Sequence, residues 1–205
     1  MTLTDEEKRI SDGALKFAKA NRRAIARRFT DPKIYVPEQH PVSVFMAGSP
    51  GAGKTEASIE LIQKIGTPVI RIDPDDLRNE CPGYTGDGTL SNYDRARRNI
   101  DRSLGRKRTV QILYVYQEPM LAWDFVVARE AAEGRRIKPE HFVEQYFAAR
   151  EVVNRLKREY GGAIAVDLLL KNNDNSNRMY KAGVDQVDHH IPERYTRADV
   201  ERMLE

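Results

Sequence analysis

One motif in the sequence has residue types and spacing suited to holding a polyphosphate. Residues 48–55 match the pattern G-x-x-x-x-G-K-[ST] in full. Its glycines let the backbone fold around an anion, so that amide N–H groups and the start of a following helix point at phosphate oxygens. Lys54 is expected to reach the β and γ phosphates, and Thr55 to bind Mg²⁺ through its hydroxyl. The expected nucleotide-binding residues are Gly48, Ser49, Pro50, Gly51, Ala52, Gly53, Lys54 and Thr55.

The residues on either side of this motif favour the same interpretation over a chance match in a glycine-rich turn. Residues 42–47 form a short apolar run that ends at Gly48, which predicts a buried parallel strand. Residues 54–65 are expected to form a helix that Gly66 ends. A strand, a glycine-rich turn and a helix in this order predict a site for ATP or GTP with Mg²⁺.

Three acidic residues stand at the end of a second predicted strand, residues 68–73. They are Asp73, Asp75 and Asp76. In a parallel sheet, ligands gather beyond the carboxyl ends of the strands, where the glycine-rich loop also lies. A carboxylate there can accept a proton from a substrate hydroxyl, which is the role we favour for Asp75. The alternative is that these acids cap a short helix over 76–80, and we prefer it for Asp76.

Arginines flank a Glu-Gly turn between two later helices. Arg129, Arg135 and Arg136 are placed to meet charge that develops on a transferring phosphoryl group, if the turn acts as a lid. A solvated charged surface is the alternative, and it is our preferred interpretation for Arg135.

The remaining pattern alternates helices and strands. Helices are expected over 5–29, 92–104, 120–133 and 139–160, and strands over 109–117 and 163–170. An Asn-rich turn is expected at 171–178, and Thr196 with Asp199 predicts a capping box for a closing helix. The fold class is therefore α/β: a three-layer P-loop NTPase with a mostly parallel sheet flanked by helices, plus an N-terminal helix.

Composition sets limits on organisation and class. The chain has 205 residues, a net charge of +3 and one cysteine, Cys81. We expect a helical extension and linker over 1–38 and a P-loop kinase domain over 39–205. The single cysteine excludes an intramolecular disulfide framework. The small charge surplus does not indicate nucleic-acid binding, and no apolar stretch is long enough for a membrane or signal segment, so a cytoplasmic location is expected.

Taken together, these motifs resemble the zeta toxin family, which are P-loop kinases of toxin–antitoxin modules. The resemblance rests on the ordered combination of GSPGAGKT, IDPDD, Asp87-Gly88-Thr89 and the arginines around RRIKP, over roughly residues 40–170. It implies that Asp75 is the base that activates a sugar hydroxyl. It further implies that Asp87 and Thr89 bind substrate near the metal, and that Arg129 and Arg136 contact the nucleotide phosphates.

The resemblance also implies the reaction and the partners. The family phosphorylates UDP-N-acetyl amino sugars, chiefly UDP-N-acetylglucosamine, and an antitoxin protein is a possible partner. The residues themselves leave other functions open. One is a P-loop kinase for another hydroxyl, such as a nucleic-acid 5′ end or an antibiotic, and another is a nucleotide-binding regulatory module that transfers no phosphate.

The sequence departs from the family pattern at one place. In the family, the acid-Gly-Thr motif closes a third strand that lies between the first two. Here only eleven residues separate Asp75 from Asp87, which is too short for a helix and a crossover strand. We therefore expect either an interruption of the chain between Gly86 and Asp87, which we favour, or direct pairing of 42–47 with 68–73 and displacement of Asp87 and Thr89 from the loop.

Overall fold

The computed structural model describes residues 5–73, 76, 92–133, 137–172, 174, 178–191 and 194–205. These residues fall into two compact units. One comprises residues 1–38 and 62–88, and the other comprises residues 39–61 and 89–205. Among the described helices, none combines the length and apolar composition needed to cross a bilayer.

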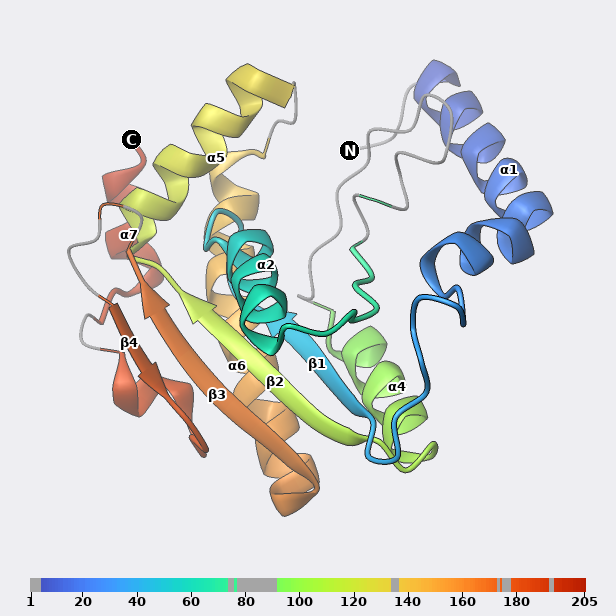
Figure 1. Ribbon diagram of the computed structural model, residues 1–205. Helices are drawn as coiled ribbons and strands as arrows, with labels where there is room; N and C mark the ends of the chain where they lie inside the picture. The colour runs from blue at the N-terminus through green and yellow to red at the C-terminus, as the bar shows by residue number, and fades with distance from the viewer. Residues whose placement is uncertain are drawn as a thin grey trace. The chain divides into compact units, whose positions relative to one another are not determined.

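The larger unit is built on a four-stranded sheet in the order β1-β2-β3-β4 (Figure 1). Strands β1 (Val42–Ala47), β2 (Thr109–Tyr116) and β3 (Ile164–Lys171) are parallel, and β4 (Arg178–Lys181) is antiparallel to β3. The register pairs Val42 with Thr109 and Val110 with Ile164. Parallel neighbours require long connections, and helices supply much of them here.

The side chains of β2 alternate between the two faces of the sheet, and helices pack against both faces. On one face, Leu113 and Val115 pack with Ala52, which precedes α2 (Lys54–Ile65), and with Ala57 and Leu61 of that helix. On the other face, the even-numbered residues of β2 pack against α4 (Tyr93–Leu104) and α6 (Pro139–Tyr160). Helices α5 (Pro119–Glu133) and α7 (Arg197–Met203) also contribute to this second core. The predicted three-layer α/β fold is confirmed.

Helix α6 illustrates why the core forms where it does. Its buried residues recur at spacings of three and four, which gives one apolar face, and they include Phe142, Tyr146, Ala149, Val153 and Leu156. The Phe142 ring packs against Trp123 with ring centroids 5.1 Å apart and against Tyr146 at 5.9 Å. Aromatic contacts thus join α5 to α6 over the sheet.

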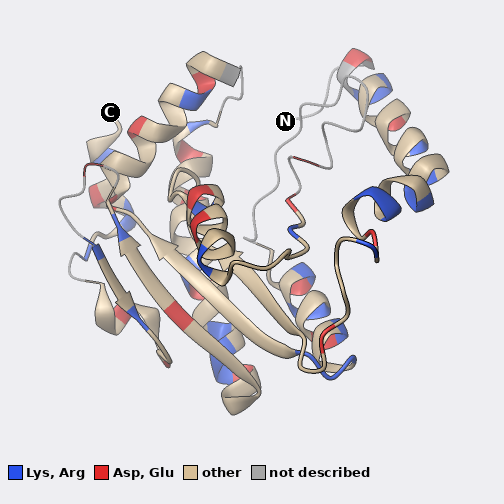
Figure 2. Cartoon of the chain, viewed as in Figure 1, with Lys and Arg blue, Asp and Glu red and all other residues tan. Residues whose placement is uncertain are grey.

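The smaller unit contains α1 (Asp5–Phe29), with the bounds expected from the sequence. The Asp31 side chain accepts a hydrogen bond from the Lys33 backbone N–H at 2.9 Å, which forms the turn that follows. Lys and Arg are spread along α1 and also along α4 of the other unit (Figure 2).

Helices α2 and α6 also begin and end as predicted, and Thr196 and Asp199 form the predicted capping box.

The prediction of a strand over 68–73 is wrong. These residues carry no strand, and the side chains of Ile70 and Ile72 are 42% and 66% exposed. A strand is stable only when a neighbour pairs with it, and Pro68 removes one donor from the segment. The direct pairing of 42–47 with 68–73 is therefore also wrong. The expected interruption at Gly86–Asp87 lies outside the described residues.

Strand β4 was not expected: its first residue, Arg178, ends the predicted Asn-rich turn, and no strand was predicted after that turn. Two donors from this region reach Asp167, which is buried in β3. They are the Tyr180 hydroxyl and the Gly183 backbone N–H, the latter at 2.9 Å. The contact with Asp167 raises the pKa of Tyr180 to about 12. Four exposed residues thus become a strand through a tertiary contact.

Replacement of Phe142 tests this description of the core. Phe142→Ala should lower the free energy of unfolding by about 3–5 kcal/mol, because it leaves a cavity between α5 and α6. Urea unfolding followed by circular dichroism measures the change. Phe17→Ala removes an equally large ring from α1. Because the Phe17 side chain is 37% exposed, this variant should lower the free energy of unfolding much less. Equal losses for the two variants would contradict the assignment of the core.

Candidate nucleotide-binding site

The phosphate loop connects the end of β1 to the start of α2, and its backbone lies close against two other elements. A Cβ atom added to Gly48 would lie 2.3 Å from the Val115 carbonyl oxygen of β2. One added to Gly51 would lie 2.0 Å from the Ala122 carbonyl oxygen of α5. Both glycines also have positive φ angles, +144° and +71°, which side chains disfavour. The loop therefore holds its conformation only with glycine at these positions.

Lys54 is hydrogen-bonded within this loop. Its Nζ donates to the carbonyl oxygens of Gly48 at 3.1 Å and Ser49 at 2.7 Å. Ser49 itself is buried. The lysine therefore carries its positive charge at the N-terminus of α2, where the helix dipole adds further positive potential. This arrangement is suited to binding a negatively charged group.

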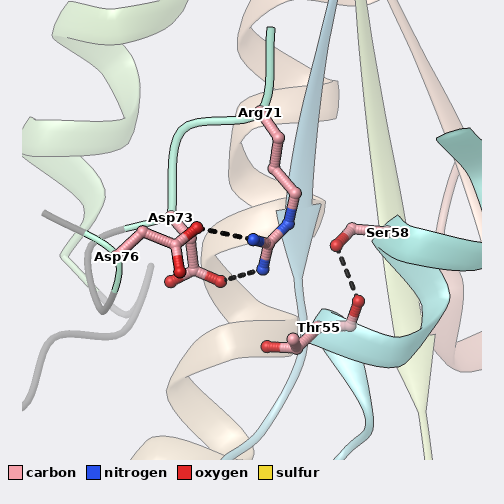
Figure 3. Close-up of polar contacts among 5 residues, drawn as sticks. All are labelled: Thr55, Ser58, Arg71, Asp73 and Asp76. Carbon is pink, nitrogen blue, oxygen red and sulfur yellow. Dashed lines mark hydrogen bonds and ion pairs between the residues drawn. The ribbon is translucent and has the colours of Figure 1, made fainter. Parts of the chain in front are cut away.

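Thr55 is exposed in the first turn of α2, and its carbonyl accepts a hydrogen bond from the Ser58 hydroxyl at 2.7 Å (Figure 3). Its own hydroxyl is a hard oxygen ligand of the kind that Mg²⁺ prefers. The described residues contain no group of three His, Cys, Asp or Glu side chains that could hold a metal. A threonine hydroxyl beside a phosphate loop fits a magnesium ion that takes its other ligands from phosphates and water.

The acidic segment lies in the smaller unit and is organised by Arg71. One terminal nitrogen of its guanidinium donates to Asp73, and the other donates to Asp76 at 2.7 Å (Figure 3). Asp73 is largely buried in this contact, with 16% of its side chain exposed. The two acids that flank the predicted proton acceptor in the sequence are thus engaged by one cation. Asp75 lies outside the described residues.

Of the other predicted site residues, one lies within the described part of the chain and the rest do not. Asp87, Thr89 and Arg136 lie outside the described residues. Arg129 is half-buried in α5, the helix whose Ala122 carbonyl meets the loop. Arg129 lies seven positions after Ala122 in this helix, which corresponds to roughly 10 Å along the axis.

Sequence reasoning missed a set of polar groups that follow β2 and β3. The Glu118 carboxylate accepts hydrogen bonds from the backbone N–H groups of Met120 at 2.9 Å and Leu121 at 3.0 Å, which caps α5. The Glu118 backbone N–H donates to the Asn172 side chain at 3.2 Å. Gln117 is fully buried beside them. The signal for this set was the presence of polar residues where two apolar runs end.

These features define the class of protein: a P-loop protein of the nucleotide-binding α/β type, with the loop, Lys54 and Thr55 at the carboxyl end of the first strand of its sheet. A family model, described as Zeta toxin, matches residues 25–87 and 86–185. The chain therefore belongs to the zeta toxin family, whose members are P-loop kinases.

A solved structure supports the fold independently. The chain is similar to a chain in the structure of the PezAT chromosomal toxin–antitoxin system of the human pathogen Streptococcus pneumoniae. The TM-score is 0.59 at 15% identity, over 99% of this chain and 94% of the other. A comparison with curated protein sequences finds no match.

The family match is divided into two segments that meet at residues 86–87. This is the place where the spacing between Asp75 and Asp87 departs from the family pattern. The departure thus coincides with a discontinuity in the match itself, while both flanking segments retain the family's pattern.

Replacement of Gly51 tests the geometry of the loop. Gly51→Ala should lower the free energy of unfolding by about 1–3 kcal/mol, because the methyl group meets the Ala122 carbonyl and the φ angle disfavours it. Thermal melting without nucleotide measures the effect. Gly162→Ala is the matched control, since its Cβ would meet nothing within 4 Å. A melting temperature for Gly51→Ala equal to that of the control would contradict the close contact.

Proposed function

We propose that this protein is a kinase that transfers the γ-phosphate of ATP or GTP to a sugar hydroxyl of UDP-N-acetylglucosamine. The observation that carries the proposal is the phosphate loop, with Lys54 held on it, in a member of the zeta toxin family. The family supports phosphoryl transfer, and the choice of UDP-N-acetylglucosamine comes from the resemblance.

The proposed roles begin at the loop. Lys54 turns from the carbonyls of Gly48 and Ser49 to the β and γ phosphates, while the loop N–H groups bind their remaining oxygens. Thr55 would hold Mg²⁺, which neutralises phosphate charge when bound. A lysine already placed within the loop needs little rearrangement to reach the phosphates, which favours efficient charge stabilisation.

For proton acceptance we propose Asp75. Asp73 and Asp76 already accept hydrogen bonds from Arg71, so their oxygens are engaged by a cation. Asp87 and Thr89 are proposed to bind the sugar nucleotide. Arg129 and Arg136 are proposed to stabilise charge on the transferring phosphoryl group, and such residues matter more for transfer than for nucleotide binding.

We further propose an antitoxin protein as a partner, because the similar solved chain belongs to a toxin–antitoxin system. Binding of a co-expressed neighbouring gene product, measured by co-purification, tests this part of the proposal.

The reaction is tested by incubating the protein with ATP or GTP, Mg²⁺ and a panel of UDP-sugars, and by measuring product masses. The expected product is UDP-N-acetylglucosamine with one added phosphate. Transfer to RNA 5′ ends or to an antibiotic would replace the proposed acceptor. Nucleotide binding without transfer to any acceptor would support a regulatory module instead.

Lys54→Ala should lower phosphate transfer by about a hundredfold or more, since it removes the cation that meets the β and γ phosphates. The measurement is the initial rate of transfer at saturating nucleotide. Lys64→Ala, in the last turn of the same helix, is the matched control and should retain the wild-type rate. Near-normal transfer by Lys54→Ala would refute the assignment of this lysine.

Asp75→Asn should retain nucleotide binding and lose phosphate transfer, because an amide cannot accept the proton of the acceptor hydroxyl. Calorimetric binding and the transfer rate, measured on the same preparation, separate the two effects. Asp73→Asn is the matched comparison and should remain active. If Asp73→Asn is inactive and Asp75→Asn is active, the two roles are reversed, and if both are active neither is the base.

A further inference from the structure

Gln117 follows β2 directly and has no exposed surface. Neither its side-chain nitrogen nor its side-chain oxygen has a hydrogen-bond partner among the described residues. No other buried side-chain polar atom in the described part of the chain lacks a partner. A buried amide without partners is costly, because it loses its hydrogen bonds to water and gains none in return. Such a group calls for a physical explanation.

The surroundings of Gln117 point to the phosphate loop. Gly48 meets the carbonyl of Val115, two residues before Gln117, and Gly51 meets the carbonyl of Ala122, five residues after it. The side chain of Val115 packs with Ala52 of the loop. Both ends of the segment that carries Gln117 therefore contact the loop.

The loop contains acceptors that are occupied by Lys54. The Nζ of Lys54 donates hydrogen bonds to the carbonyl oxygens of Gly48 and Ser49, and both of these residues are buried. When Lys54 turns to a phosphate, as the proposed function requires, these carbonyls lose a charged donor. The Gln117 amide N–H has no partner among the described residues and belongs to the segment between the two loop contacts, so it can replace the lysine as donor.

We infer that Gln117 is a positioning residue of the nucleotide-bound phosphate loop. Its side-chain N–H group donates, directly or through one buried water, to the loop carbonyls that Lys54 leaves. The bound conformation of the loop is thereby stabilised relative to the conformation in which Lys54 contacts its own loop. This inference rests on the proposed nucleotide binding, and it adds a residue outside the G-x-x-x-x-G-K-[ST] motif to the site.

The test uses Gln117→Met, which keeps a similar volume and removes both polar atoms. Without nucleotide, this variant should unfold at the same urea concentration as the wild type or a higher one, because it removes an amide that has no partner. Its affinity for a non-hydrolysable ATP analogue with Mg²⁺ should be about threefold to tenfold weaker by calorimetry, which corresponds to the loss of one hydrogen bond. A side chain with a purely structural role would not combine weaker nucleotide binding with an unchanged or higher urea midpoint.

Gln111→Met is the matched control. Gln111 lies in β2, the strand that Gln117 follows, and its side-chain nitrogen donates to Asp167. Its replacement should lower the urea midpoint and leave nucleotide affinity unchanged. Unchanged affinity in Gln117→Met would overturn the inference. A lower urea midpoint in that variant would also overturn it, because the amide would then be hydrogen-bonded without nucleotide. Failure of the wild-type protein to bind the analogue would instead refute the proposed function, and the inference with it.

Discussion

The close approach of the phosphate loop to two carbonyl groups is the constraint on which the site depends. Gly48 and Gly51 lie against the carbonyls of Val115 and Ala122, at distances that leave no room for a side chain. Because these carbonyls belong to β2 and α5, the loop takes its shape from elements that follow it by some sixty residues in the chain. Packing of β2 beside β1 is therefore a condition for forming an anion-binding loop, as well as a source of stability.

A different constraint acts on the acidic segment. The residues Pro68 to Asp73 have the β-branched composition of a strand, but they form none, and Arg71 instead contacts Asp73 and Asp76. This contact neutralises acidic side chains that would otherwise repel one another close to Asp75 in the sequence. Arg71 thus forms ion pairs with Asp73 and Asp76, the acids that precede and follow the proposed base in the sequence.

The sequence predicted most accurately those features that depend on local patterns. The phosphate loop requires a few residues in fixed order, and α6 follows from apolar spacing along 22 residues, so both could be recognised without knowledge of the rest. The strand at 68–73 could not be judged in this way, because a strand exists only where a neighbour pairs with it. Strand β4 depends on Asp167, and the burial of Gln117 depends on the packing of several elements. Tertiary contacts of this kind do not appear as a periodic pattern of residues in the sequence. The roles of Asp75, Asp87, Thr89, Arg129 and Arg136 remain predictions.

The contact between Trp123 and Phe142 has an optical consequence. Trp123 is the single tryptophan of the sequence, and it directly follows Ala122, whose carbonyl meets Gly51 of the phosphate loop. The emission of an indole depends on the polarity and rigidity of its surroundings. Any displacement of the loop that moves the start of α5 changes the packing of this ring. The protein thus carries an intrinsic fluorophore next to a residue that contacts the phosphate loop, with no second indole to obscure its signal.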